Sequence, residues 1–284
     1  MTVLPADTHV HSEYSWDTGG PRSSAAGTME RTCARAVRIG LPALVFTEHL
    51  DLTGWQASPE DFPEHERHLI DQNGFMQPPP MDVDGYLASI DRCRRLFPEL
   101  QILTGVEFGQ PHLDGRAARA RVDLTTLDRV NGSLHTLPLG ASRSEPVTLF
   151  RELTDPAAVI WMYLAEVPVM VDGGDFEVFT HLDYAVRSWP VAEHGPFDPR
   201  PFEDGFRQAM RTIAGSGRAL EMNTAGRLQP WIPQWWAEEG GRAVSFGSDD
   251  HDGSGLAAHF LEAAAHLEHL GFRPGRRAAD FWTR

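Results

Sequence analysis

Short apolar runs that favour β-strands alternate with helix-like segments along almost the whole chain, and this alternation narrows the possible folds more than any other feature. Strands that alternate with helices form a mostly parallel sheet, and apolar runs suit strands buried on both faces. The predicted strands are Val3–Thr8, Ala43–Thr47, Gln101–Glu107, Arg129–Leu134, Glu177–His181, Ala219–Asn223 and Ala243–Gly247. The predicted helices are Thr28–Ile39, Tyr86–Leu96, Ala157–Leu164, Phe206–Ala214 and Gly255–Leu270.

Polar residues that could bind a metal ion or take part in catalysis follow nearly every predicted strand at its C-terminal end. In an open doubly wound sheet, ligands gather at one switch point, whereas in a barrel all C-terminal strand ends meet at one mouth. The distribution therefore favours an α/β barrel of seven units, with an open sheet as the alternative. No linker, repeat or low-complexity block divides the 284 residues, so we expect a single domain over residues 1–284.

The composition excludes several functions. The net charge of −15 leaves no basic footprint for nucleic acid, so no nucleic-acid partner is expected. Cys33 and Cys93 are too few for a disulfide framework or a cysteine-based zinc site. Phosphate-binding P-loops, strand-borne G-x-G-x-x-G motifs and G-x-S-x-G elbows are missing from the sequence, which removes the usual support for kinase, dinucleotide-binding and serine-hydrolase functions.

The sequence also bears on location. The segment Met1–Asp7 has neither a basic leader nor an apolar core of the kind found in signal peptides. The longest nearly apolar run, Ala157–Val171, contains Glu166 and Pro168 and is too short to span a bilayer. We therefore expect a cytoplasmic protein without membrane contact, and the sequence makes no prediction about its oligomeric state.

The ends of the first and seventh predicted strands carry pairs of candidate metal ligands. His9 and His11 are two residues apart in an extended segment, so their side chains project to the same side and can meet one ion. Asp249 and His251 repeat this spacing after the last strand. Further His, Asp and Glu residues follow the other strands or their loops: Asp17, Glu48, His49, Glu107, His135, His181 and Asp183. Each is an ordinary polar residue when taken alone, but together they form a donor set suited to zinc, manganese or iron.

The order of these residues forms a recognisable set of motifs. They are Asp7-Thr8-His9-Val10-His11-Ser12, Thr47-Glu48-His49, Gly105-Val106-Glu107, Gly132-Ser133-Leu134-His135, Thr180-His181-Leu182-Asp183 and Gly247-Ser248-Asp249-Asp250-His251. The set resembles the polymerase-and-histidinol-phosphatase (PHP) superfamily, and among its branches it is most similar to the stand-alone histidinol phosphatases. The similarity extends from the first predicted strand to the seventh, and its specificity lies in the order of the motifs.

The resemblance implies a distorted, TIM-like (β/α)7 barrel that holds three divalent metal ions, of zinc, manganese or iron, at its C-terminal mouth. Carried over by position, the first ion would be bound by His9, His11, Glu107 and Asp249. The second would share Glu107 as a bridge and add His135 and His181. The third would be bound by Asp17, His49 and His251. Many relatives have His at the position of Asp17, and Asp is an accepted alternative in the histidinol phosphatase branch.

The implied activity is hydrolysis of a small phosphorylated metabolite, L-histidinol phosphate or a similar phosphomonoester, by hydroxide that the metals generate from water, in histidine biosynthesis. Arginine offers a bidentate fork to phosphate, which makes Arg187 and then Arg227 the predicted substrate-binding residues. The segments Pro138–Asp155 and Ala225–Trp231 differ from the histidinol phosphatase pattern. Since they would face the substrate, its identity stays open.

Two alternatives remain at this point. One is a phosphodiesterase or nucleotidase of the same superfamily, because related metal clusters cleave either type of ester. The other is a non-catalytic PHP module that binds a partner protein. Modules of that kind lose ligands, whereas this sequence keeps all nine candidate positions.

Overall fold

The computed structural model describes residues 4–20 and 28–284 and is built around one large curled sheet. Its strands, in spatial order, are β1 (Asp7–Val10), β2 (Ala43–Leu50), β5 (Gln101–Gly109), β6 (Arg129–Ser133), β9 (Val178–Phe179), β10 (Ala219–Asn223), β11 (Ala243–Gly247) and β12 (Trp282–Thr283). The first seven pair in parallel, and β12 pairs antiparallel with the start of β11. Each predicted strand corresponds to one of the seven parallel strands, although Val3 lies outside the described residues.

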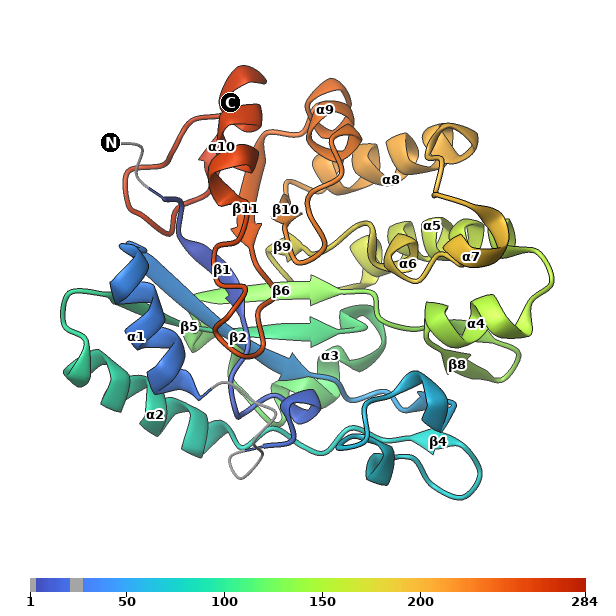
Figure 1. Ribbon diagram of the computed structural model, residues 1–284, viewed down its shortest axis with the longest axis horizontal. Helices are drawn as coiled ribbons and strands as arrows, with labels where there is room; N and C mark the ends of the chain where they lie inside the picture. The colour runs from blue at the N-terminus through green and yellow to red at the C-terminus, as the bar shows by residue number, and fades with distance from the viewer. Residues whose placement is uncertain (1–3, 21–27) are drawn as a thin grey trace.

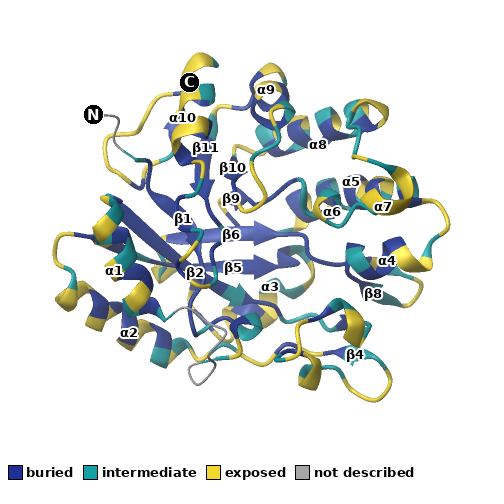
Figure 2. Ribbon diagram, viewed as in Figure 1, coloured by how far each residue is buried: buried dark blue, intermediate teal, exposed yellow. Residues whose placement is uncertain are grey.

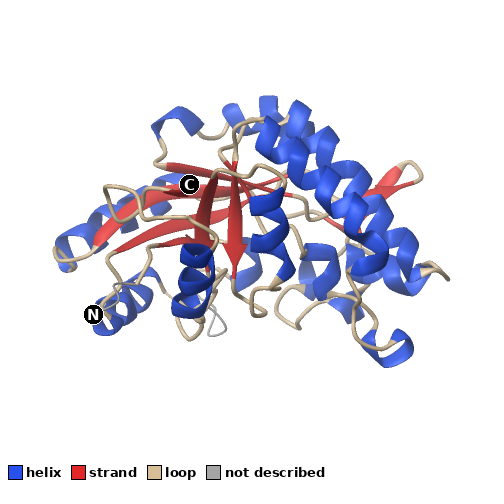
Figure 3. Cartoon of the chain, turned by 90° about the horizontal axis from the view of Figure 1, so that it is seen from above, coloured by secondary structure: helices blue, strands red, loops and turns tan. Residues whose placement is uncertain are grey.

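The sheet curls until its first and seventh strands meet. Val10 forms an isolated parallel bridge with Asp250, just beyond β11. The amide of Asp249 donates to the carbonyl of His9 (2.8 Å), and the amide of His11 donates to the carbonyl of Asp250 (2.9 Å). Figure 3 shows how strongly the strands twist and curl. This seam confirms the predicted distorted barrel, because it brings the C-terminal ends of β1 and β11 side by side.

Helices cover the outside of the sheet (Figure 1). The longer ones are α1 (Met29–Ile39), α2 (Val83–Leu96), α3 (Pro111–Arg119), α5 (Pro156–Gly173), α8 (Glu203–Gly215), α9 (Trp231–Glu238) and α10 (Phe260–His269). The shorter ones are α4 (Pro146–Glu152), α6 (Tyr184–Arg187), α7 (Val191–His194) and five 3-10 turns, η1 (Trp16–Thr18), η2 (Pro59–Asp61), η3 (Arg67–Leu69), η4 (Leu124–Thr126) and η5 (Arg200–Phe202).

The predicted helices lie where the structure has helices, and two of them, α5 and α10, differ most in their bounds. Helix α5 continues beyond the predicted end at Leu164 to Gly173, although Pro168 lies inside it. Helix α10 begins at Phe260 rather than Gly255, because Ala257 and His259 adopt left-handed backbone angles (φ of 52° and 59°) that interrupt a helix. The apolar spacing that predicted both helices does not show where each helix begins or ends.

The hydrophobic core lies between the sheet and its helices. Figure 2 shows the strands buried along most of their length and the outward faces of the helices exposed. Phe46, Phe108 and Phe179, on β2, β5 and β9, are fully buried, and they belong to a cluster that extends from Val10 to Trp282. Among the described residues, no helix combines the length and apolarity needed to cross a bilayer.

A second, smaller sheet stands beyond the C-terminal ends of the main strands (Figure 1). It consists of β4 (Phe75–Met76), β3 (Trp55–Gln56), β8 (Ser142–Ser144) and β7 (Leu137–Leu139), in that order. Its strands come from the chain segments that follow β2 and β6, and Trp55, Ala57, Phe62 and Met76 form a small core of its own. This sheet was not predicted, and it builds one wall of the mouth of the barrel.

Candidate metal centre

The seam between β1 and the end of β11 aligns the two predicted ligand pairs. Because Val10 pairs with Asp250, the neighbours of each residue come together, so His9 and His11 face Asp249 and His251. The buried carboxylate of Asp7 fixes this seam: it accepts hydrogen bonds from the amides of Ser248 and Ala257, each at 3.0 Å. Burial raises the pKa of Asp7 to about 7.

The first predicted ligand set converges on one point. His9 Nε2 lies 3.3 Å from Glu107 Oε2 and 3.5 Å from Asp249 Oδ1. His11 Nε2 lies 3.4 Å from each of the same two oxygens. One donor atom from each of these four residues lies within 4.8 Å of the other three, which is the spacing that ligands of a single cation need.

The second set gathers on the other oxygen of Glu107. His135 Nε2 lies 3.1 Å from Glu107 Oε1, and His181 Nε2 lies 2.7 Å from it. The parallel register explains this position, because Glu107 on β5 pairs with His49 on β2 and with Asn131 on β6. Glu107 therefore projects between the imidazoles of the first ligand set and those of His135 and His181. In this position two cations could share its carboxylate.

The third set lies nearer to solvent. Asp17 Oδ2 is 3.3 Å from His49 Nε2 and 2.8 Å from His251 Nε2, so the three predicted residues meet. Asp51 was missed by the sequence analysis, yet its oxygens lie 3.4 Å from His49 Nδ1 and 3.2 Å from His135 Nδ1. Its signal was a carboxylate two residues after a predicted ligand, the spacing already noted for His9 and His11.

Contacts behind the ligands hold the imidazole rings in place. The nitrogen of His9 that faces away from the centre, Nδ1, lies 2.6 Å from the carboxylate of Glu221 on β10. His11 Nδ1 lies 2.8 Å from the hydroxyl of Ser15, which itself donates to Glu48 at 2.6 Å. Contacts of this kind fix the orientation of a ligand ring and raise its affinity for metal. Neither Glu221 nor Glu48 was assigned this role from the sequence.

The electrostatics of the site follow from buried opposite charges. Burial alone lowers the pKa of His9, but the carboxylates of Glu221, Glu107 and Asp249 outweigh it and hold this pKa well above its usual value. Burial raises the pKa of Glu107, but the surrounding imidazoles, first that of His9, outweigh it and hold this pKa well below its usual value. Burial lowers the pKa of His11 to about 3, which keeps that ring in the neutral, metal-binding form.

Two of the predicted ligands have strained backbones. His181 and Asp249 adopt positive φ angles, of 22° and 57°, in the region that residues with a side chain rarely occupy. Strain of this kind costs about 1–3 kcal/mol per residue and clusters at functional sites. At both positions the backbone turns where a strand has ended, so the strain coincides with the side chains that reach the centre.

The ligand atoms of these residues are better placed to bind cations than to form hydrogen bonds with one another. Among the described residues, Glu107 Oε2, Asp17 Oδ1, His49 Nδ1 and His251 Nε2 are buried without a hydrogen-bond partner. Glu107 Oε2 has three imidazole nitrogens within 3.4 Å, yet none is aligned to donate to it. Unpaired buried polar atoms are costly, and a cation between them would remove that cost. The residues present therefore fit a cluster of divalent ions.

A cavity of about 270 Å³ opens over this cluster. Seven of the nine predicted ligands line it, and His9 and His11 lie fully buried beside them. Arg187 also lines the cavity, where its guanidinium donates to Asp249 at 2.9 Å. Arg227, the second predicted substrate-binding residue, does not reach it: its side chain is 71 % exposed beside Glu262, in a separate groove. The positive φ of Arg227 (70°) turns the chain away from the mouth.

The outer part of the cavity contains carboxylates and aromatic rings. Glu145 and Glu66 line it together with the rings of Trp16, Trp55 and Tyr184. Burial raises the pKa of Glu145 to about 8 and that of Glu66 to about 7. Glu145 lies inside the segment Pro138–Asp155 that departs from the expected pattern.

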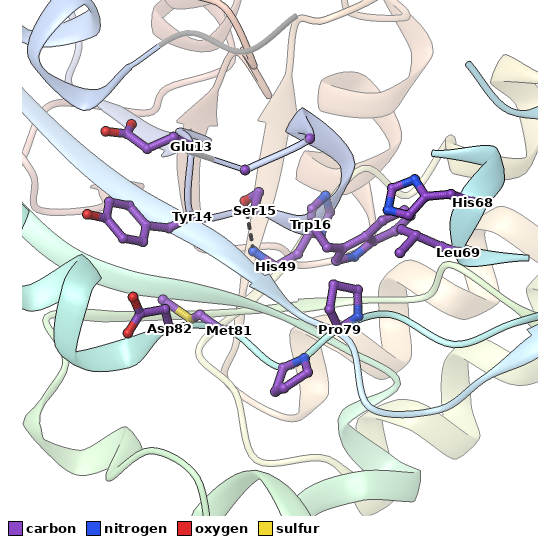
Figure 4. A pocket seen from close by; sticks show the side chains of 13 residues that line it. Glu13, Tyr14, Ser15, Trp16, His49, His68, Leu69, Pro79, Met81 and Asp82 are labelled. Carbon is purple, nitrogen blue, oxygen red and sulfur yellow. Dashed lines mark hydrogen bonds between the residues drawn. The ribbon is translucent and has the colours of Figure 1, made fainter. Parts of the chain in front are cut away.

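A second cavity of about 240 Å³ lies on the other side of the segment Ser15–Trp16 (Figure 4). Tyr14, Leu69 and Met81 give it largely apolar walls. His49 is the one predicted ligand that lines both cavities, and its amide donates to the hydroxyl of Ser15 at 3.1 Å. The segment Ser15–Trp16 therefore separates an apolar space from the charged one.

Comparison with known protein families agrees with this geometry. The family described as the PHP domain matches residues 7–225, which is more than half of the chain and includes seven of the nine predicted ligands. The chain belongs to the PHP domain family. This match confirms the predicted family and the predicted barrel. In this chain, the aligned strand ends bring the candidate ligands together.

Individual relatives point in the same direction. A probable histidinol-phosphatase from Deinococcus radiodurans is 26 % identical over 282 residues, covering 96 % of both chains. One from Clostridium acetobutylicum is 23 % identical and covers 94 % of both. Among solved structures, histidinol phosphate phosphatase from Lactococcus lactis, crystallised with zinc, L-histidinol and phosphate, superposes with a TM-score of 0.70 at 18 % identity over 99 % of both chains. This PHP protein is therefore a histidinol-phosphatase-like hydrolase.

Proposed function

We propose that this chain is a metal-dependent phosphatase that hydrolyses a small phosphomonoester, with L-histidinol phosphate as its substrate in histidine biosynthesis. The observation that supports the proposal most directly is the pair of ligand sets that share Glu107 on the floor of a cavity lined by Arg187. In this proposal His9, His11, Glu107 and Asp249 hold one divalent ion, Glu107, His135 and His181 hold a second, and Asp17, His49 and His251 hold a third.

The chemistry divides between the ions and the protein. Bound zinc, manganese or iron lowers the pKa of water toward 7 and neutralises charge on a phosphoryl group. The ligand residues fix where that charge lies, since Glu221 and Ser15 hold the rings of His9 and His11 rigidly. Arg187 is held by Asp249 at the edge of the site, where its remaining N–H groups can bind a phosphate oxygen. The wall that contains Trp55 and Phe62 limits access of bulk water.

The size of the cavity supports a small substrate. Its volume of about 270 Å³ is near the lower end of ligand pockets, which extend from roughly 300 to 1,000 Å³. The named relatives support the choice of L-histidinol phosphate, because two are called probable histidinol-phosphatases and a third was crystallised with L-histidinol and phosphate. We also infer that residues 1–284 form one domain, which the continuous core from Val10 to Trp282 supports.

The test is phosphate release by protein reconstituted with zinc, manganese or iron. The substrates are L-histidinol phosphate, a 5′-nucleotide and a dinucleotide, and metal content is measured on the same samples. We expect three ions per chain and the highest kcat/KM for L-histidinol phosphate. A higher kcat/KM for the dinucleotide or the nucleotide would replace this proposal by a phosphodiesterase or nucleotidase. Protein that binds almost no metal and cleaves none of the three would be a non-catalytic PHP module.

A further inference from the structure

The carboxylate of Glu145 is buried in the cavity without a counter-ion. Glu145 is 9 % exposed, and the structure gives its side chain no hydrogen bond or ion pair with any described residue. It occupies the N-cap position of α4 but does not cap that helix. A buried carboxylate is costly unless it is paired. Since no described residue supplies the partner, a molecule admitted to the cavity would have to supply it.

The neighbouring charges leave this part of the cavity negative. Asp61 is neutralised, because Arg151 forms an ion pair with it and Thr148 donates to it at 2.7 Å. Among the described residues, Glu66 has an ion-pair contact only with His65, at 3.4 Å. The sequence contains no lysine, and Arg187, the one described arginine that lines the cavity, is already bound to Asp249. Glu145 and Glu66 therefore present two carboxylates that no described arginine neutralises.

Aromatic side chains surround the same carboxylates. Trp55 lies on β3, whose Gln56 pairs with Ser144, the residue before Glu145. The indole N–H of Trp55 is buried and has no acceptor among the described residues. The rings of Trp16 and Tyr184 also line this space. Aromatic faces attract cations, and flat rings pack well against a planar group. The outer part of the cavity thus offers an unpaired acceptor, an unpaired donor and aromatic walls.

We propose that Glu145, assisted by Glu66, binds a protonated nitrogen of the substrate while the phosphate of the same molecule lies at the metal centre. This inference rests on the proposed function and narrows it to phosphomonoesters that carry a protonated amine. Phosphate and cation would then occupy opposite ends of one cavity, the first near Arg187 and the second near the small sheet. Neutral or purely anionic phosphate esters would leave Glu145 buried and unpaired, and the enzyme would discriminate against them.

The experiment compares an ester that carries a protonated amine with one in which acetylation has removed that charge and added an acetyl group; because both variants meet the same added bulk, the change in the ratio reports the charge. Metal-loaded protein is assayed with L-histidinol phosphate and with the same ester acetylated on its amine. We expect the unmodified protein to prefer the cationic ester by about 10- to 100-fold in kcat/KM, the range for a hydrogen bond to a charged group. Glu145→Gln is expected to reduce this ratio at least several-fold. Glu99→Gln, on an exposed residue outside the cavity, is the matched control and should keep the ratio.

Two further measurements do not depend on turnover. By calorimetry, Glu145→Gln should weaken binding of L-histidinol, the alcohol without phosphate, about tenfold or more. The same variant should unfold at about the same temperature as the unmodified protein at pH 7, because burial raises the pKa of Glu145 to about 8 and Gln then replaces an unpaired carboxyl group that is largely neutral. A structural role for Glu145 predicts a lower unfolding temperature. Glu66→Gln should lower the preference ratio in the same direction.

The outcomes separate the two proposals. A wild-type ratio near one, or equal losses for both esters in Glu145→Gln, would overturn the role of Glu145 and leave the phosphatase intact. An unchanged ratio in Glu66→Gln would remove Glu66 from the assignment. If the protein hydrolysed neither ester, the proposed function would fail, and calorimetry with L-histidinol alone would still decide whether Glu145 binds a cation.

Discussion

One carboxylate connects the whole centre. The oxygens of Glu107 lie within 3.4 Å of five imidazole nitrogens, those of His9, His11 and His49 on one side and of His135 and His181 on the other. Among the described residues, Glu107 is the one side chain that the first and second ligand sets share. The consequences of losing it should therefore exceed those of losing any single imidazole.

Replacing Glu107 with Gln tests this directly. Gln keeps the shape but removes the negative charge between the two ligand groups, so we expect kcat/KM to fall by at least about 100-fold and bound metal to decrease. His266→Ala, on α10 and outside the centre, should leave both values nearly unchanged. The checks are phosphate release and elemental analysis, and equal activity in the two variants would contradict the assignment.

Glu221 should act through His9 rather than through the substrate. Its carboxylate lies 2.6 Å from His9 Nδ1 and accepts a hydrogen bond from the amide of His181 at 2.9 Å. Glu221→Gln should weaken metal affinity by about 10- to 100-fold, as expected for a residue that orients a ligand. A chelator competition measures this, with the exposed Glu193→Gln as control. Unchanged affinity combined with lost activity would instead place Glu221 beside the substrate.

The sequence motifs located the nine candidate ligands because these residues lie near the C-terminal ends of strands, which the sequence predicts. The structure brings all nine together, and their metal binding stays a prediction. Glu145 was missed for a physical reason. It lies in a segment that follows a strand, and its proximity to the site depends on how two such segments pair in the small sheet. Spacing along the chain does not encode that pairing, whereas Asp51 could have been found from its position two residues after His49. The structure places Arg227 outside the cavity, and its role in binding substrate stays a prediction.

Elements of the main sheet were predictable, and those of the small sheet were not. Six of the seven parallel strands contain four to nine residues, enough to show a pattern, and the short β9 (Val178–Phe179) lies within the longer predicted run Glu177–His181. Strands such as Trp55–Gln56 and Phe75–Met76 contain two residues each, too few for any period to appear. Since the small sheet forms the outer wall of the cavity, the fold and the metal centre follow from the sequence more readily than substrate selection does.

Helix α5 offers a test of an element within the divergent region. Its N-cap residue, Asp155, accepts a hydrogen bond from the amide of Ala157 at 2.9 Å. Asp155→Ala should lower the free energy of unfolding by about 1 kcal/mol, because an amide of the first turn loses its acceptor. Asp155→Asn should keep most of this energy, since Asn caps helices equally well. Urea denaturation measures both, and identical midpoints for Asp155→Ala and the unmodified protein would exclude a capping role.

At the scale of the whole molecule, charge and folding are linked to metal. The net charge is −15, and the mouth of the barrel holds several carboxylates: Asp17, Asp51 and Glu107 contact His49, and Asp249 contacts His9 and His11. Divalent ions there would offset local repulsion and would bind the folded chain only, because the ligands come from six different strands or their ends. The same ions would therefore serve stability as well as catalysis.

Removing the metal should destabilise the entire protein. An ion present at 100 times its Kd stabilises the folded state by about 2.7 kcal/mol, and several ions add their contributions. Treatment with a chelator should abolish phosphate release and lower Tm, and added zinc or manganese should restore both. Calorimetric scans with and without chelator measure the shift. An unchanged Tm in protein shown to have lost its metal would mean that the ions do not hold the barrel together.

The contacts of Asp7 have a consequence for biosynthesis. Its carboxylate accepts hydrogen bonds from amides that lie 241 and 250 positions later in the chain. A ribosome adds about 5–20 residues per second, so the nascent first strand can pair with β2 early but stays without its other neighbour, β11, for roughly 10–50 s. Throughout that interval the histidines and apolar residues of the first strand lack their final contacts. Premature termination anywhere before the last strand leaves a polypeptide without a complete pocket. Molecular chaperones that shield emerging chains should accordingly matter more for this protein than for one closed by local hairpins.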